Sequence, residues 1–142
     1  MMKALFRRIL YIFLLLYQRS SGRIGGKVQG LPVLLLTTTG RKTGKKRITP
    51  LGYLEYDGHY VVTASNAGFD TQPGWFHNLT SNPQVRVQIR DKQFAAIAER
   101  AEPTLRQRLW ATFVERAPGY GAYQKRTARE IPIILLRPVS PS

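Results

Sequence analysis

The amino-acid sequence predicts an α+β domain built on a small, closed or nearly closed β-barrel of about six mostly antiparallel strands with flanking helices. Apolar and β-branched runs alternate with turn signals, and Asp57-Gly58 between two such runs is a strong hairpin signal. Helical segments are inserted between the hairpins. The first three strand segments are joined by turns alone, which disfavours a parallel sheet, because parallel strands need long crossover connections.

The size and charge of the chain set the range of partners to consider. Its 142 residues are enough for one domain with its own core. Lys and Arg number 22 against 8 acidic residues, giving a formal net charge of +14, and Glu55 is the first acidic residue. A basic half of this kind suits nucleic acid, an anionic membrane surface or an acidic cofactor, and composition does not rank the three. The sequence has no Cys and only two His, so we expect no disulfide and no metal site.

The first element, over residues 1–21, is predicted to be a retained basic and apolar helix. Lys3, Arg7 and Arg8 precede an apolar run over residues 9–17, which is shorter than the roughly 20 residues that a membrane span needs, and no cleavage pattern follows it. Such a helix suits a membrane interface, with its cations toward lipid headgroups. Packing of its apolar side against the barrel or a subunit partner, as in a homodimer, is an equally good alternative. An uncleaved signal anchor is a weaker third.

A glycine-rich linker is expected over residues 22–30, the barrel domain over 31–138 and a disordered tail over 139–142. The predicted strands share apolar runs or alternation of polar and apolar residues, and they cover residues 32–39, 48–56, 60–65, 84–89, 93–101 and 131–137. Asp70-Thr71-Gln72-Pro73 supplies capping residues and a proline suited to a first helical turn, so residues 74–79 are predicted to form a short helix. Two further helices, over residues 103–115 and from Gly119 to Ala128, are separated by a Pro-Gly break.

The connection between the first two barrel strands is typical of an anion site. It reads Gly40-Arg41-Lys42-Thr43-Gly44-Lys45-Lys46-Arg47 and holds five cations and two glycines. The glycines allow positive φ and inward-turned N–H groups, while the Arg, Lys and Thr side chains add donors for phosphate or carboxylate. The glycine spacing is too short for a P-loop. The alternative is a solvated hairpin tip whose cations keep a sheet edge soluble.

Several uncommon local motifs follow this loop in a fixed order. They are Thr49-Pro50-Leu51-Gly52-Tyr53, Val61-Val62-Thr63-Ala64-Ser65-Asn66, Pro73-Gly74-Trp75-Phe76-His77-Asn78-Leu79, Asn82-Pro83, Pro118-Gly119-Tyr120-Gly121-Ala122-Tyr123-Gln124 and Ile131-Pro132. Together with the basic loop they resemble the deazaflavin-dependent nitroreductase family, the split β-barrel oxidoreductases that depend on coenzyme F420. The resemblance covers about residues 31–138.

The resemblance implies a split β-barrel that holds a deazaflavin ring in a groove, with the phosphate and oligoglutamate tail of coenzyme F420 along a basic surface. It implies hydride transfer from reduced F420 to a small hydrophobic electron acceptor, such as a quinone, an enone or a nitroaromatic compound. The residues implied to bind the cofactor are Arg41, Lys42, Thr43, Gly44, Lys45, Arg47, Ala64, Ser65, Asn66, Trp75 and Asn78. The alternative for Trp75 is a core anchor, and the alternative for Asn78 is a residue that closes its helix.

The tyrosines Tyr53, Tyr120 and Tyr123 resemble those that line the acceptor side of the family's pocket. One of their hydroxyls, or that of Ser65, would donate a proton or hydrogen bond to negative charge developing on the acceptor, so these four residues are the catalytic candidates. The alternative is that the rings of Tyr120 and Tyr123 pack under the barrel. Gly52 replaces a bulkier residue of the family pattern, and this change enlarges the pocket or loosens the strand.

Three rival interpretations remain at this stage. A nucleic-acid-binding barrel is disfavoured, because the aromatic residues do not alternate with cations along strands. An FMN-binding version of the same barrel is harder to separate, although the surplus of cations favours the longer anionic tail of F420. A lipid- or fatty-acid-binding barrel without the chemistry is the third. We expect a cytoplasmic oxidoreductase at the inner face of the plasma membrane.

Overall fold

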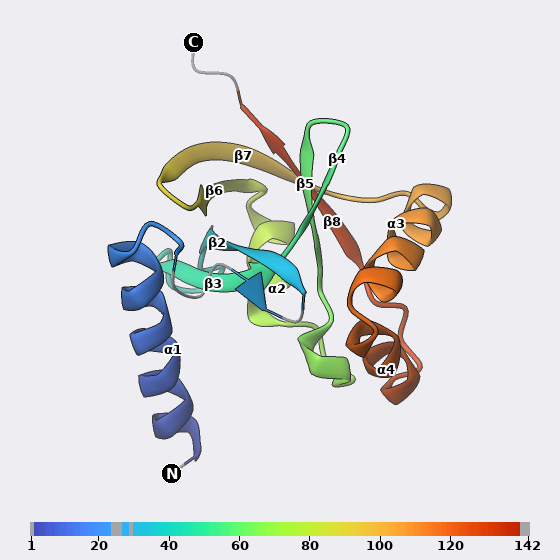
Figure 1. Cartoon of the computed structure of the whole chain (residues 1–142), viewed down its shortest axis with the longest axis horizontal. Coiled ribbons are helices and arrows are strands. Elements are labelled where there is room, and N and C mark those ends of the chain that lie inside the picture. The colour runs from blue at the N-terminus through green and yellow to red at the C-terminus, as the bar shows by residue number, and fades with distance from the viewer. Residues whose placement is uncertain (1, 24–26, 29, 140–142) are drawn as a thin grey trace.

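The computed structural model describes residues 2–23, 27–28 and 30–139 (Figure 1). Its elements in chain order are α1 (Met2–Arg19), β1 (Lys27–Val28), β2 (Leu31–Thr39), β3 (Lys46–Gly52), β4 (Leu54–Tyr56), β5 (His59–Thr63), the 3-10 turn η1 (Asn66–Gly68), α2 (Gly74–Ser81), β6 (Gln84–Ile89), β7 (Lys92–Arg100), α3 (Pro103–Arg116), α4 (Gly119–Arg126) and β8 (Ile133–Pro138). The expected glycine-rich linker and disordered tail fall partly on residues 24–26, 29 and 140–142, which lie outside the described residues.

One curled sheet organises the fold. Its strand order is β1-β2-β6-β7-β8-β5-β4, with β3 on the other edge of β2, and every pairing in the described part of the chain is antiparallel. β4, at one end of this order, and β3, beside β2 near the other end, are consecutive in the chain with Tyr53 alone between them. The sheet therefore curls so that these two strands follow one another directly, as Figure 1 shows. This arrangement confirms the predicted α+β split barrel.

The predicted strand over residues 48–56 is two strands with different partners. β3 pairs with β2, whereas β4 pairs with β5. The chain turns at Tyr53, whose N–H still donates to Pro32 O at 2.9 Å while its ring is buried in the barrel core. Tyr is a favourable strand residue, and the one local sign of this break is Gly52 just before it, which weakens a strand. Smaller differences lie at the ends of other elements: β5 ends at Thr63 and α4 ends at Arg126.

Strand β2 is buried on both faces, which explains its nearly continuous apolar sequence. Leu34 and Leu36 point into the barrel core. Val33 and Leu35 point to the opposite face, where they form a second cluster with Tyr17 of α1, and Phe13 and Leu14 pack against it. Of the alternatives for the N-terminal helix, the structure therefore shows packing against the barrel through the second half of α1.

The hydroxyl of Tyr17 replaces a missing bond in the sheet. β2 and β6 pair at Leu35 and Gln88, and the same register would next place Val33 opposite Arg90. Arg90 has a φ of 56° and has left the strand. Tyr17 Oη donates to Val33 O at 2.8 Å and accepts from Arg90 N at 3.0 Å, so it bridges the two strands where they separate. Burial is the main cause that raises the pKa of Tyr17, and the hydroxyl stays protonated at neutral pH.

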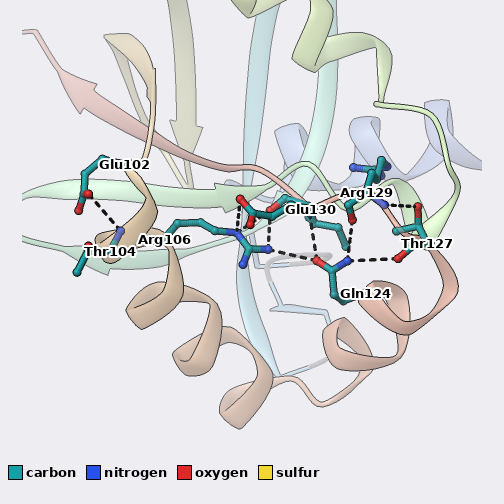
Figure 2. A network of polar contacts seen from close by, with 8 residues as sticks. Glu102, Thr104, Arg106, Gln124, Thr127, Arg129 and Glu130 are labelled. Atoms are coloured by element: carbon teal, nitrogen blue, oxygen red, sulfur yellow. Dashed lines mark hydrogen bonds and ion pairs between the residues drawn. The ribbon is translucent and has the colours of Figure 1, made fainter.

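Helices α3 and α4 pack on the outer face of the sheet, as α1 does, but at β5 and β8, with which they form a third apolar cluster. Figure 2 shows the polar contacts that fasten them. Arg106 of α3 donates from Nε to Ile131 O at 3.1 Å and from Nη2 to Gln124 Oε1 at 3.2 Å. Gln124 of α4 donates in turn to Arg129 O at 2.7 Å and accepts from Ile131 N at 3.1 Å. These contacts fix α4, which carries Tyr120 and Tyr123.

We expect Tyr17→Phe to lower the free energy of unfolding by about 1–3 kcal/mol, because it leaves Val33 O and Arg90 N–H without their shared partner. Tyr11→Phe is the matched control, since Tyr11 lies on the same helix and is 63% exposed. Its effect should stay within about 0.5 kcal/mol. Urea unfolding measures both changes. Equal midpoints for the two variants would contradict the bridging role.

Candidate functional site

A cleft of about 1110 Å³ lies between α1, the β2–β3 hairpin and the start of α2. We call it the basic cleft, and its lining residues are Arg7, Leu10, Leu14, Gly40, Arg41, Lys42, Thr43, Lys46, Arg47, Ile48, Thr49, Gly74, Trp75 and Asn78. Five of these side chains are cationic and none is acidic. The cleft therefore fits a long ligand with several negative charges.

The hairpin loop is held open by its own backbone and by α2. Gly44 has a φ of +70°, and its N–H donates to Gly40 O at 2.8 Å. A Cβ at Gly40 would lie 2.8 Å from Thr43 Oγ1 and 3.1 Å from Lys45 O, so a larger residue here would force the Thr43 side chain to shift. Asn78 of α2 accepts from Arg41 N at 3.1 Å and donates to Thr38 Oγ1 at 3.1 Å. Asn78 thus ties the loop to β2 and lines the cleft as well.

The structure separates the predicted cofactor-binding residues into two groups. Those that line the basic cleft are Arg41, Lys42, Thr43, Arg47, Trp75 and Asn78. Those that do not are Gly44 and Lys45 in the hairpin loop and Ala64, Ser65 and Asn66 after β5. Ala64 is fully buried in the barrel core, its N–H donates to Pro132 O at 2.9 Å and its carbonyl oxygen accepts from Arg129, so it is not open to a ligand.

The wall that α1 contributes was missed by the sequence analysis. Arg7, Leu10 and Leu14 lie at spacings of three and four residues, which is one face of a helix. That spacing is visible in the sequence. Which part of the protein this helix face meets is decided by tertiary packing, which the spacing does not reveal. Arg7 adds a cation opposite the loop, and the two leucines cover part of the cleft with apolar surface.

The segment after β5 is strained and externally braced. Asn66 and Ala67 both have left-handed backbone angles, with φ of 46° and 53°, which are costly for residues other than glycine. The guanidinium of Arg129 donates to three carbonyl oxygens of this segment, Ala64 O at 3.2 Å, Ser65 O at 2.9 Å and Phe69 O at 2.9 Å. Arg129 therefore positions Ser65. Sequence reasoning missed it, because nothing near Arg129 marks it as a long-range partner.

The predicted tyrosines lie away from the basic cleft, toward the far end of β3. Tyr120 sits among Phe113, Trp110 and Tyr123, with ring centroids 5.4, 6.4 and 5.6 Å away. A Cβ built on Gly52, the last residue of β3, would be 3.1 Å from the Tyr120 hydroxyl oxygen. Gly52 and Arg47 are five residues apart, or about 17 Å along a strand. An elongated ligand along β3 would reach both ends.

The titration of the tyrosines follows from their burial. Burial is the main cause that raises the pKa of Tyr120 above 10.0, with the nearby Tyr123 second, and a hydrogen bond with Thr63 opposes them. Burial likewise raises the pKa of Tyr53, whose ring meets that of Tyr60 edge-on at 5.7 Å. Both hydroxyls are therefore protonated at neutral pH and available as hydrogen-bond donors.

The described residues contain no group of three or more His, Cys, Asp or Glu arranged to hold a metal ion. None of the helices in the same residues combines the length and apolar character needed to cross a membrane.

We expect Arg129→Met to speed amide hydrogen exchange over residues 65–69 by about tenfold or more, because three carbonyls lose a charged donor. Arg126→Met is the control, since Arg126 makes a single longer contact of 3.4 Å with Ala67 O. Its exchange should change little. Hydrogen exchange measured by mass spectrometry compares the two variants without any ligand. Equal exchange rates in Arg129→Met and Arg126→Met would contradict the positioning role of Arg129.

Comparison with known families gives a match over most of the chain. The F420H(2)-dependent quinone reductase family model matches residues 10–138. An F420H(2)-dependent quinone reductase of Mycobacterium tuberculosis (strain ATCC 25618 / H37Rv) is 40% identical over 125 residues, which cover 85% of this chain and 84% of that protein. A putative F420H(2)-dependent quinone reductase of the same strain is 36% identical over 108 residues, covering 76% of this chain and 91% of that protein.

Solved structures of similar chains share the fold. An F420-H2 dependent reductase, FDR-A, has a TM-score of 0.69 at 40% identity and covers 75% of this chain and 94% of its own. A structure described as a domain-swapped dimer has a TM-score of 0.71 at 34% identity and covers 93% of this chain and 98% of its own.

Proposed function

The chain belongs to the F420H(2)-dependent quinone reductase family and is an F420-dependent oxidoreductase, and from this we propose that it reduces a quinone with the cofactor held along the basic cleft. The observation that carries the assignment of the site is the charge of that cleft, with five cations and no acidic residue among its lining. A tail of phosphate and repeated carboxylates is the ligand that such a surface attracts and holds.

The residues fit the cofactor in two parts. Arg41, Lys42, Thr43 and Arg47 would hold the anionic tail, with Arg7 from the opposite wall. Gly44 and Lys45 would support the loop from behind. Trp75 would border the ring together with Asn78, whose hydrogen bonds fix the loop. Ser65 and Asn66, in the segment that Arg129 braces, would border its other side, with Ala64 buried beneath them.

When bound, reduced F420 supplies a hydride from C5 of its deazaflavin ring. The quinone gains that hydride and one proton to give the hydroquinone, so the protein must place the acceptor and stabilise charge on its oxygen. The Tyr120 hydroxyl, kept protonated by burial, would donate a hydrogen bond to that oxygen, with Tyr53, Tyr123 and Ser65 as further candidate donors. Leu10 and Leu14 of α1 would keep water from the cleft. Nitroaromatic compounds and enones offer similar oxygens and form a second acceptor class.

The outer face of α1 supports a peripheral contact with the cytoplasmic face of a membrane. Leu5, Ile9, Ile12 and Leu16 recur at spacings of three and four residues and are 60%, 57%, 55% and 43% exposed. We call them the outer stripe. Arg7 and Arg8 lie beside it and complement anionic headgroups. The competing occupant is a second copy of the chain, which would make a homodimer.

Titration of the protein with F420, followed by fluorescence, tests the cofactor site. We expect Lys42→Ala and Arg41→Ala each to weaken binding about tenfold, because each removes a charge-assisted contact, and we expect added salt to weaken binding further. Lys92→Ala is the control, since Lys92 is exposed and lies outside the lining of the basic cleft. If FMN binds more tightly than F420 in a parallel titration, the site is a flavin site and the assignment of F420 to it is wrong.

Sedimentation with lipid vesicles tests the outer stripe. We expect Ile12→Asn to reduce binding to anionic phosphatidylglycerol vesicles about tenfold, because an apolar side chain would no longer enter the interface. Val139→Asn is the control, since Val139 is 43% exposed and lies outside α1. Light scattering is measured on the same variants. A change in molar mass without a change in vesicle binding would assign the stripe to a subunit contact instead.

A further inference from the structure

We propose that an apolar pocket between α1 and the end of β3 binds the hydrocarbon tail of the quinone acceptor, an inference that rests on the proposed function. The pocket has a volume of about 310 Å³, and its lining residues are Ile9, Leu10, Phe13, Val33, Pro50, Leu51 and Gly52. None of them has a polar side chain. Pro50 also lacks a backbone N–H, so this stretch of β3 has one donor fewer. Such a surface selects hydrocarbon.

The apolar pocket continues the basic cleft along the same strand. Residues 46–49 of β3 line the cleft, and residues 50–52 line the pocket. Leu10 of α1 borders both, so one helix forms a wall for the two spaces. The groove between α1 and β3 therefore changes along its length from cationic to apolar. A tail lying in the apolar part would stay next to the cleft proposed for the cofactor.

Gly52 lets the Tyr120 hydroxyl come close to the end of the pocket. It has no positive φ, so its backbone conformation does not require glycine. A Cβ at this position would lie 3.1 Å from the Tyr120 hydroxyl and 3.2 Å from Leu31 Cδ1, which is closer than a side chain is normally accommodated. Glycine here therefore lets the hydroxyl of Tyr120, the candidate donor to the quinone oxygen, lie directly against the pocket wall. This accounts for the departure of Gly52 from the family pattern.

The pocket size sets the kind of tail. Its volume of about 310 Å³ is at the lower end of small-molecule pockets, enough for the first units of a prenyl chain rather than for a whole long tail. Ile9 lines the pocket and is 57% exposed, so the pocket opens at the outer stripe. A longer tail would leave there. A fatty-acyl chain has the same chemistry, and the experiment separates the two sources.

Steady-state kinetics with two naphthoquinones test the proposal, one without a tail and one with a short prenyl tail, in detergent-free buffer with F420 reduced in advance. We expect the prenyl tail to raise kcat/KM about tenfold or more in the unchanged protein, because it buries several methylene and methyl groups. Ile9→Trp fills the mouth of the pocket, and the ratio of the two efficiencies should fall toward one. Tyr11→Trp, on the exposed side of the same helix, should keep the ratio.

Photolabelling gives a readout that needs neither cofactor nor turnover. A prenyl alcohol carrying a diazirine should label residues 9–13 and 50–52, and Ile9→Trp should reduce that labelling. The proposal is overturned if the prenyl tail brings no gain in kcat/KM and the label is found outside residues 9–13 and 50–52. If oleate prevents the labelling as strongly as unlabelled prenyl alcohol does, and the prenyl tail brings no gain in kcat/KM, the pocket binds a lipid acyl chain instead. If neither quinone is reduced while F420 still binds, the proposed function itself fails.

Discussion

The double burial of β2 is the constraint on which the other parts of the site depend. One face of the strand fills the barrel and the other carries α1, and the Tyr17 hydroxyl closes the sheet where β2 and β6 separate. α1 supplies one wall of the basic cleft and of the apolar pocket. The position of that wall is therefore set by a core contact rather than by the ligand, and both spaces exist before any ligand arrives.

Buried or half-buried guanidinium groups give order to the opposite side of the molecule. Arg106 fastens α3 to the segment before β8, and Arg129 braces the strained turn after β5. Both donate mainly to backbone carbonyl oxygens, which local secondary structure leaves without partners. The proposed acceptor side is thus assembled from irregular segments held by long side chains, whereas the proposed cofactor side is built on a regular hairpin. These polar contacts make the irregular segments rigid.

Much of the fold was predictable from sequence, because hairpin signals, strand periodicity and capping residues are local. The strand over residues 84–89 and the basic loop are examples, and six of the cleft residues follow from the loop and the 74–79 helix. The break at Tyr53 was only hinted at by Gly52 before it, since a tyrosine there suits either one strand or two. Arg7 and Arg129 were missed for another reason. Their roles depend on partners about 30 to 65 residues away, and no local pattern encodes such contacts.

Ile9 belongs to two surfaces at once, the outer stripe and the lining of the apolar pocket. If the stripe rests on a bilayer, the pocket mouth opens into the acyl layer rather than into water. The acceptor would then diffuse in sideways, and its hydroquinone would return the same way without crossing an aqueous phase. Turnover would follow the number of acceptor molecules per unit of lipid area, so dilution of the acceptor with inert lipid would slow the enzyme at constant bulk concentration.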